Sequence, residues 1–391
     1  MPAAFDGVRV LELGQIYNGP YCGLLLAQLG ADVIKIEPPG GEQLRFRSHQ
    51  PVESHEFVML NSNKRSVVLD LKTDAGRQAL LDLVETADVL IENFAPGTME
   101  RLQLAPQRLL ERNPRLIVAC GKGYGSTGPY AHMSAMDITV QAMSGSAATT
   151  GEPDGPPTKA GAAFVDFSGG IHLFGAVSAA LFQRERTGRG QIVEVSMHDS
   201  VYPMLASSLG GLHNDPDRPL PERTGNRHSG MAVAPYNIYP AIDGWLAIIC
   251  IAERHWHGVA TALGRPELID DPRFGTAKDR VANIDAVDAE VSSVTRTRTR
   301  ADLVRDLQAA GVPCAPVKSI REVDTDEHLI QRGMITYVEH PARGRVPVPG
   351  CPLRLGDSPL GPLRAAPPLG ASTEEVLAEV SGEETQHVVH A

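Results

Sequence analysis

The sequence has no excess of positive charge. Its 391 residues carry 36 Lys and Arg against 47 Asp and Glu, for a formal net charge of −11. Because nucleic-acid binding depends on basic patches, this balance argues against DNA or RNA as the main partner. An anionic small molecule remains compatible with it, since a local cluster of Lys and Arg can outweigh the global sign.

Cysteine is scarce and shows no CxxC spacing. The cysteines are odd in number and far apart in the chain: Cys22, Cys120, Cys250, Cys314 and Cys351. This pattern is typical of reduced thiols, so we expect a cytoplasmic protein. The start, MPAAFDGVRVLELG, lacks a basic segment followed by an apolar one, and we expect no signal peptide. No apolar run approaches the roughly 20 residues of a membrane helix, and we expect no membrane partner.

Several catalytic signatures are missing as well. The candidate histidines are His132, His198, His255 and His257. None of them lies in a metal-ligand spacing such as HExxH, so we expect no metal site. Neither Ser126 nor Ser168 lies in GxSxG, which disfavours a serine hydrolase. The segment GQIYNGP lacks the glycines of GxGxxG, which disfavours a dinucleotide, although Glu37 occupies the place of a ribose-binding acid.

The sequence does contain a regular alternation of strand and helix patterns. Apolar strand patterns occupy residues 8–13, 32–37, 66–71, 88–93, 116–121 and 191–197. Helical patterns lie between them, including a long apolar helix predicted at about 170–183. This order predicts an α/β fold with a Rossmann-like parallel sheet.

The composition changes after the last of these elements. The segment NDPDRPLPERTGNRHSG is rich in Pro, Gly and charge, as interdomain linkers are. We therefore predict a large α/β domain over residues 1–205, a linker over 206–222 and a smaller α+β domain over 223–320. Residues 321–391 are too rich in proline to form a core of their own, and we expect them to return to the large domain.

Basic residues gather near the predicted strand ends of the N-terminal third: Lys35, Arg45, Arg47, Lys64, Arg65, Lys72, Arg101 and Lys122. Open α/β sheets bind ligands at the carboxyl ends of their strands, and a phosphate-rich ligand needs positive charge there. Most Lys and Arg simply face solvent. We therefore expect Arg101 and two or three others to contact such a ligand, rather than the whole set.

Asp166 lies in an otherwise apolar segment, about one turn ahead of the helix predicted at 170–183. A buried carboxylate costs several kcal/mol unless something compensates it. Asp166 is either a helix N-cap, a position that Asp favours, or a functional group. Ser168 lies nearer to the predicted helix start and also caps, so we expect Asp166 to face a pocket. There the N–H groups around Gly169 and Gly170 would hold its charge.

Segments spread over nearly the whole chain together resemble the family III CoA-transferases. They are FDGVRVLEL, GADVIKIEPPGGEQLR, NSNKRSVVLDLK, ADVLIENFAPGTMERLQL, GYGSTGPY, FVDFSGG with TGRGQIVEVSM, HPARGRVPVPGCPLRL and PPLGASTEEVL. Each segment alone is a weak signal, but their combination in this order is specific. The resemblance implies a CoA-transferase that moves CoA from an acyl-CoA donor to a carboxylic acid.

The resemblance also implies that Asp166 is the catalytic nucleophile. It would attack the thioester carbonyl of the donor and form a mixed anhydride, which the CoA thiolate would convert into an aspartyl-CoA thioester. An acceptor carboxylate would then receive the CoA through a second anhydride. Coenzyme A is thus part of the substrate, and no tightly bound cofactor is implied.

Positions in these motifs, together with Lys122 from the basic set, give the predicted CoA-binding residues: Gln15, Ile16, Tyr17, Asn18, Arg45, Leu69, Lys72, Asn93, Phe94, Arg101, Lys122 and Met136. The acceptor is expected to be a small organic or dicarboxylic acid, whose second carboxylate would meet Arg227 or His228. The resemblance further implies a homodimer of two interlocked rings, in which each chain threads the other through its linkers.

Two departures from the family pattern bear on the reaction. The segment GNRHSGMAVAPYN lacks the glycine run that closes over the site in formyl-CoA transferase, which argues against formate or oxalate as substrate. Met136 stands where the related racemases have a histidine, and a thioether carries no proton. This disfavours the alternative of a 2-methylacyl-CoA racemase without eliminating it. A catalytically idle CoA-binding protein is a further alternative.

Overall fold

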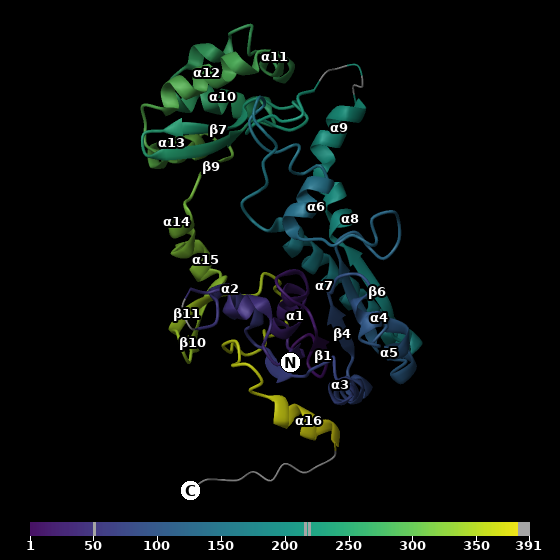
Figure 1. The fold of residues 1–391 in the computed structure, drawn as a ribbon. Coiled ribbons are helices and arrows are strands. Elements are labelled where there is room, and N and C mark those ends of the chain that lie inside the picture. The colour runs from purple at the N-terminus through teal and green to yellow at the C-terminus, as the bar shows by residue number, and fades with distance from the viewer. Residues whose placement is uncertain (50–51, 215–216, 218–219, 382–391) are drawn as a thin grey trace. The chain divides into compact units, whose positions relative to one another are not determined.

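The structure is a computed structural model that describes residues 1–49, 52–214, 217 and 220–381. The contacts within the chain form two compact units (Figure 1). Among the described residues, the first comprises those of Met1–Val140, Ala162–Val201 and 326–381, and the second those of Gln141–Gly161 and Tyr202–Thr325. The sequence predicts residues 141–161 as part of the large domain, whereas their contacts group them with the second unit.

A parallel sheet forms the centre of the first unit. Within the described residues it has six strands in the order β3-β2-β1-β4-β5-β6. Their bounds are β1 (Arg9–Glu12), β2 (Asp32–Glu37), β3 (Arg65–Val68), β4 (Val89–Glu92), β5 (Ile117–Lys122) and β6 (Gln191–Ser196). The predicted α/β fold with a parallel sheet is thereby confirmed. Because strand order reverses direction between β1 and β4, this point is where open α/β sheets bind ligands.

Helices cover both faces of this sheet, because successive strand residues point to opposite sides. Val10 belongs to the apolar cluster on one face, and Leu11, its neighbour in β1, belongs to the cluster on the other. Each fully buried Leu or Val stabilises the fold by about 1.5–3 kcal/mol. The helices are α1 (Asn18–Gln28) and α7 (Phe164–Thr187) on the Val10 face, and α3 (Asp74–Thr86) and α5 (Pro106–Arg112) on the Leu11 face.

Helix α7 begins at Phe164, well before the predicted start at Gly170. Gly169 and Gly170 therefore lie inside the helix, and the prediction that Asp166 precedes it was wrong. The glycines allow a close approach of α7 to α1, since a Cβ on Gly169 would lie 2.2 Å from Nδ2 of Asn18. The small residues that look like a helix break in the sequence thus serve packing between two helices.

Helix α7 is also long and apolar enough to cross a membrane by length and composition, the one such helix in the described part of the chain. No apolar run of this length was expected from the sequence. Leu173, Val177 and Leu181 are buried in the cluster that α7 shares with α1 and the sheet. Core helices of globular domains pass the same test, and this packing accounts for the apolar composition of α7.

The C-terminal segment packs onto the first unit. Val338 and Val346 belong to an apolar cluster with Leu24 and Phe57, and Val376 joins the cluster on the α3 face. The elements of this segment are α15 (Glu327–Gln331), β10 (Ile335–His340), β11 (Gly344–Pro349) and α16 (Thr373–Ser381). The shorter elements elsewhere in the unit are η1 (Gln43–Phe46), α2 (His55–Asn61), α4 (Thr98–Arg101), α6 (Asp137–Met143), whose last residues belong to the second unit, and α8 (Met197–Val201).

The second unit contains an antiparallel sheet, which has three strands in the order β7-β8-β9 among the residues described. Leu246, Trp256 and Val291 belong to its apolar core. Its main elements are α9 (Ala206–Asn214), β7 (Tyr236–Ala241), β8 (Gly244–Ile249), α10 (Glu253–Ala262), α11 (Ala277–Ala282), α12 (Ile284–Thr295), α13 (Arg300–Ala309), β9 (Cys314–Pro316) and α14 (Ile320–Asp324). Helix α9 occupies the start of the predicted linker, other parts of which lie outside the described residues.

Arg227 of this unit is already paired. Its guanidinium lies 2.6 Å from Asp285 and 2.7 Å from Asp288. His228 has its Nδ1 3.2 Å from the main-chain nitrogen of Gly230. These contacts leave Arg227 without net charge to offer a substrate carboxylate, so the expectation for Arg227 has no support in the structure.

Candidate active site

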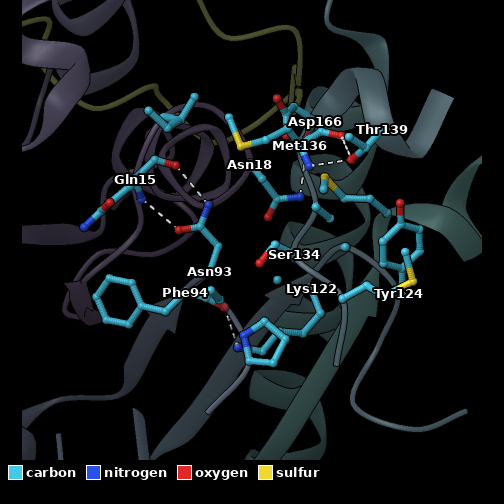
Figure 2. Close-up of a pocket in the computed structure, with 18 of the residues that line it drawn as sticks. Gln15, Asn18, Asn93, Phe94, Lys122, Tyr124, Ser134, Met136, Thr139 and Asp166 are labelled. Atoms are coloured by element: carbon cyan, nitrogen blue, oxygen red, sulfur yellow. Dashed lines mark hydrogen bonds between the residues drawn. The ribbon is translucent and has the colours of Figure 1, made fainter. Parts of the chain in front are cut away.

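A cavity of about 460 Å³ opens where β1, β4 and β5 end, at the point where strand order reverses. Side chains that follow these three strands line it, and the first turn of α7 adds Asp166. Figure 2 shows Gln15 and Asn93 on one side of the cavity and Asp166, Met136 and Thr139 on another. The site therefore forms where the general rule for open α/β sheets predicts a ligand.

Asn93 fixes the loop after β1. The main-chain N–H of Gln15 donates to Oδ1 of Asn93 at 2.8 Å, and Nδ2 of Asn93 donates to the carbonyl of Gln15 at 2.9 Å. Ile16 follows with φ of 64°, a left-handed conformation that costs energy for a branched residue. The two hydrogen bonds from Asn93, which directly follows β4, hold this strained turn across the switch point, and Gln15 and Ile16 both line the cavity.

Buried charges support the same loop from below. Nζ of Lys35 donates to the carbonyl of Gly14 at 2.8 Å and lies 3.1 Å from the carboxylate of Glu12. Lys64 lies 2.7 Å from the other oxygen of Glu12, and burial lowers the pKa of Lys64 to about 8. Both lysines are almost fully buried. Of the basic residues predicted near strand ends, these two therefore serve the fold and are closed to a phosphate.

Asp166 lies in the first turn of α7 and is only 9% exposed. It is not the N-cap, because the cap position is Ala163, without a side-chain hydrogen bond. Ser168 does not cap either, since its hydroxyl donates back to the carbonyl of Val165 at 3.1 Å. Among the described residues, no side-chain hydrogen bond is made by the carboxylate of Asp166. The helix-cap alternative for Asp166 is therefore wrong, and its carboxylate is open to the cavity.

A second carboxylate takes the place of the cap. Oδ2 of Asp137, the first residue of α6, accepts hydrogen bonds from the N–H groups of Val165 at 3.1 Å and of Asp166 at 3.3 Å. Burial first, and the negative charge of Asp137 second, raise the pKa of Asp166 from 3.8 to about 7. The expectation that N–H groups around Gly169 and Gly170 hold the charge of Asp166 needs correction. Both glycines lie inside α7, and the N–H groups of Val165 and Asp166 at the helix start bond to Asp137 instead.

The side-chain amide of Asn18 fills the floor of the cavity beneath Asp166. It is 2% exposed, and its Nδ2 donates weakly to the carbonyl of Asp166 at 3.5 Å. Its Oδ1 is buried and has no hydrogen-bond partner among the described residues. A Cβ on Gly121 would lie 2.3 Å from Oδ1, just as one on Gly169 would clash with Nδ2. Two glycines thus make the slot that holds this amide.

The cavity gathers eight of the predicted site residues: Gln15, Ile16, Asn18, Asn93, Phe94, Lys122, Met136 and Asp166. Lys122 is paired, with Nζ 2.6 Å from Glu92 and a hydrogen bond of 3.1 Å to the carbonyl of Phe94. It holds the end of β5 against the end of β4. The structure thus brings together the nucleophile predicted at position 166 and most of the residues predicted to bind CoA.

Other predicted residues lie outside the lining of this cavity. Tyr17 stacks on Phe167 at a ring separation of 5.7 Å, and Leu69 belongs to the apolar core on the α3 face. Lys72 is exposed after β3. Arg101 is also exposed and donates to the carbonyl of Pro96, itself a lining residue. Arg101 is thus placed to extend the cavity, and Lys72 stays a prediction that rests on the resemblance.

Arg45 is a correction. Its side chain is 1% exposed, its guanidinium lies 2.6 Å from Glu37, and the group stacks on Phe57 at 3.9 Å. It also donates to the carbonyl of Pro367 at 3.0 Å. A guanidinium this deeply buried and fully paired is closed to a phosphate. The same pair removes Glu37 as a ribose-binding acid.

Sequence reasoning missed several lining residues: Gln43, Ala95, Pro96, Tyr124, Met133, Ser134, Thr139 and Met197. Tyr124 lies in GYGSTGPY, one of the segments that carry the family resemblance. The contact of Asp137 with the start of α7 was missed as well. The capping contact spans 29 residues of sequence, and no local pattern announces it.

Known proteins support the same assignment. The sequence model of CoA-transferase family III matches residues 5–373. The formyl-CoA:oxalate CoA-transferase of Streptomyces coelicolor is 35% identical over 387 residues, covering 95% of this chain and 94% of that protein. A protein of the same name from Escherichia coli is 37% identical, covering 97% of this chain and 96% of its own.

Solved structures are similar over the same extent. A CaiB/BaiF family protein from Brucella suis superposes with a TM-score of 0.86 at 34% identity, covering 97% of this chain and all of its own. A protein from Mycobacterium tuberculosis superposes with a TM-score of 0.83 at 31% identity, covering 95% of this chain and 99% of its own. The family model matches nearly the whole sequence, and the two curated relatives are 35% and 37% identical over almost their full length. This chain therefore belongs to CoA-transferase family III and is an enzyme of that family.

Proposed function

We propose that this enzyme moves CoA from an acyl-CoA donor to a small carboxylic acid, with Asp166 as the covalent intermediary. The observation that carries the proposal is the state of this carboxylate, which is buried, free of side-chain hydrogen bonds to described residues, and open to a cavity of about 460 Å³. Water solvates an exposed carboxylate and makes it a poor nucleophile. Burial removes that water, so the ionised form of Asp166 is reactive.

The reaction consists of carbonyl substitutions that balance without an added reagent. An oxygen of Asp166 bonds to the thioester carbon of the donor, and the carbon–sulfur bond breaks to release the CoA thiolate. The thiolate then bonds to the aspartyl carbon, and the donor acid leaves as a carboxylate. The acceptor carboxylate reverses both steps with its own acyl carbon, which regenerates Asp166 and yields the new acyl-CoA.

The pKa of Asp166 near 7 gives both forms of the group a role. The ionised form attacks, and a considerable fraction of it exists at neutral pH. The neutral form avoids the repulsion between the two neighbouring carboxylates, Asp166 and Asp137, while no substrate is bound. In the racemase alternative, Asp166 would instead need a proton-carrying partner at position 136, and Met136 cannot be one.

Two features of the relatives enter as proposals. Their names describe formyl-CoA:oxalate CoA-transferases, which supports acyl transfer between CoA and a small acid in this chain. The interlocked homodimer implied by the resemblance is supported by large apolar side chains that the second unit exposes, including Leu212 at 60% and Ile251 at 69%. Exposed apolar surface of this kind marks interfaces. Size measurement in dilute solution should give twice the chain mass.

The test is to trap the covalent intermediate. The enzyme is incubated with an acyl-CoA donor and hydroxylamine, and peptide mass analysis should find a hydroxamate on Asp166. Asp166→Asn should give no adduct and reduce CoA exchange by about 10⁴-fold or more, as loss of a nucleophile does in other covalent enzymes. An unmodified Asp166, or full exchange by Asp166→Asn, would refute the proposal. Hydrogen exchange at the α-carbon in deuterated water without an acceptor acid would favour the racemase.

A further inference from the structure

The lining of the cavity around Asp166 is neutral. Side chains from four segments of the first unit lie here, and thioether, methyl and hydroxyl groups predominate: Ile16, Met133, Ala135, Met136, Thr139 and Met197. Met136 is 54% exposed, and Figure 2 shows it next to Asp166 and Thr139. Soft, flexible methionine side chains adapt to apolar groups of varied shape. The surroundings of Asp166 thus suit an uncharged acyl group.

This lining offers no unpaired positive charge among the described residues. Among the lining residues of the first unit that the structure describes, Lys122 is the one cation, and its Nζ lies 2.6 Å from Glu92 with a further bond to the carbonyl of Phe94. Glu92 is 1% exposed, so this ion pair is held in place at the carboxyl ends of β4 and β5. A carboxylate in the cavity would compete with a partner that Lys122 already has.

Negative charge is already concentrated here. Asp137 lies close enough to raise the pKa of Asp166, and its own oxygen is fixed by the N–H groups that begin α7. A second carboxylate on the bound acid would therefore be desolvated without a cationic partner and would face the charge of Asp137. Like charges in such a position cost several kcal/mol.

We infer that the acids exchanged at Asp166 are monocarboxylic, with an uncharged acyl body and no second carboxylate. The inference rests on the proposed function and narrows it to a substrate class. It sets this chain apart from relatives whose names include oxalate, and it revises the expectation of a dicarboxylic acceptor. The three methionines of the lining replace charge recognition by apolar contact.

The experiment compares acceptors of equal carbon number, butyrate against succinate and valerate against glutarate, with one acyl-CoA donor and the full-length enzyme. The ratio of kcat/KM should favour each monoacid by about 100-fold, which corresponds to about 2.7 kcal/mol for the unpaired charge of the diacid. Oxalate should be used no better than succinate. Equal use of succinate and butyrate would overturn the inference.

A pair of variants tests the cause. Met136→Lys places a cation beside Asp166 and should reduce the monoacid preference by about tenfold. Met136→Leu preserves the neutral surface and should retain the preference. An unchanged ratio in Met136→Lys would refute the electrostatic argument.

Hydroxylamine trapping in the same samples separates the two proposals. A hydroxamate on Asp166 together with efficient use of diacids would refute the monocarboxylic substrate class and leave the covalent role of Asp166 supported. If no donor gave a hydroxamate on Asp166 and no acid exchanged CoA, both the proposed function and this inference would be refuted.

Discussion

Asp137 caps the helix that carries Asp166, with Oδ2 of Asp137 3.3 Å from the main-chain nitrogen of Asp166. The contact does two things that oppose each other in energy. It satisfies N–H groups that the start of α7 would otherwise leave without partners, which stabilises a helix by about 1 kcal/mol. It also places a negative charge beside a buried carboxyl group, which makes that group harder to ionise. The cap therefore tunes the nucleophile.

The first prediction is a pH profile. The pKa of Asp166 is raised to about 7 by burial and by Asp137, and the ionised form attacks. The rate of hydroxamate formation should rise about tenfold per pH unit below pH 7 and level off above it. In Asp137→Asn the amide oxygen keeps an acceptor for the cap while the charge is removed. Its profile should shift to lower pH at an unchanged plateau.

The control is Asp137→Ala, which removes the cap and the charge together. It should shift the profile in the same direction as Asp137→Asn and also lower the free energy of unfolding by about 1 kcal/mol. A profile in Asp137→Asn that coincides with that of the wild type would show that Asp137 has no influence on Asp166.

The second prediction concerns stability. The folded protein holds the proton of Asp166 with a pKa of about 7, against 3.8 for the ordinary group. The stability contributed by this raised pKa is complete below about pH 4 and is lost as pH rises through 7. Asp166→Asn mimics the neutral form at every pH. Its gain in the free energy of unfolding over the wild type should be about 2 kcal/mol larger at pH 8 than at pH 5, measured by denaturant titration.

The fold could be predicted well where one kind of residue repeats. VRVLEL, DVIKIE and LIVACG are apolar on both sides, as buried parallel strands are, and each forms a strand of the sheet. The start of α7 was misjudged because Ser168, Gly169 and Gly170 have low intrinsic helix propensity. Their helical state comes from packing against Asn18, a residue 150 positions away in the sequence that propensity cannot consider.

The residues of the site likewise divide into those that the sequence placed correctly and those that it did not. Motif positions correctly placed Asp166, Asn93 and Gln15 around one cavity. Arg45 was misassigned because sequence shows its charge but not its burial, and its partner Glu37 becomes visible only when the turn after β2 is folded. The role of Asp137 likewise depends on the meeting of two helix ends in space. The sequence identifies the chemical groups of the site, but the partners of these groups become known only from the folded structure.

The third prediction tests the loop after β1. Asn93→Ala removes both hydrogen bonds to the main chain of Gln15 and frees the strained turn at Ile16. Each bond contributes about 1 kcal/mol, so the loss of both should raise KM for acyl-CoA by up to about 30-fold, while the pH profile of Asp166 stays in place. Steady-state kinetics at several pH values measures both.

A matched control lies elsewhere in the same unit. Asn113 likewise bonds through its side chain to the main chain only. It donates to the carbonyls of Val84 at 2.8 Å and Ala87 at 2.9 Å and accepts from the N–H of Arg115 at 3.0 Å, and it is not a lining residue of the cavity. Asn113→Ala should reduce the free energy of unfolding by a similar amount and leave KM unchanged. An equal rise of KM in both variants would mean that Asn93 acts through general stability alone.

The fourth prediction sets two glycines of α7 against each other. A Cβ on Gly175 meets nothing within 4 Å, whereas one on Gly169 would lie 2.2 Å from Asn18 and 2.9 Å from Met197. Alanine is favoured over glycine in a helix by about 1 kcal/mol, so Gly175→Ala should stabilise the protein by up to that amount. Gly169→Ala gains the same helix propensity but forces α7 away from α1. The clash should outweigh this gain and lower the free energy of unfolding by about 1–3 kcal/mol.

The displacement would carry Asp166 with it, so Gly169→Ala should also lose CoA exchange, whereas Gly175→Ala should keep it. Adding Asn18→Ala removes the side chain that the new methyl group meets, and the flexible thioether of Met197 can turn aside. The double variant should therefore recover most of the lost free energy of unfolding. Denaturant titration of the wild type, Gly169→Ala, Asn18→Ala and the double variant would measure this coupling. If Gly169→Ala were as stable as Gly175→Ala, the close approach of α7 to Asn18 would not be what fixes the position of the nucleophile.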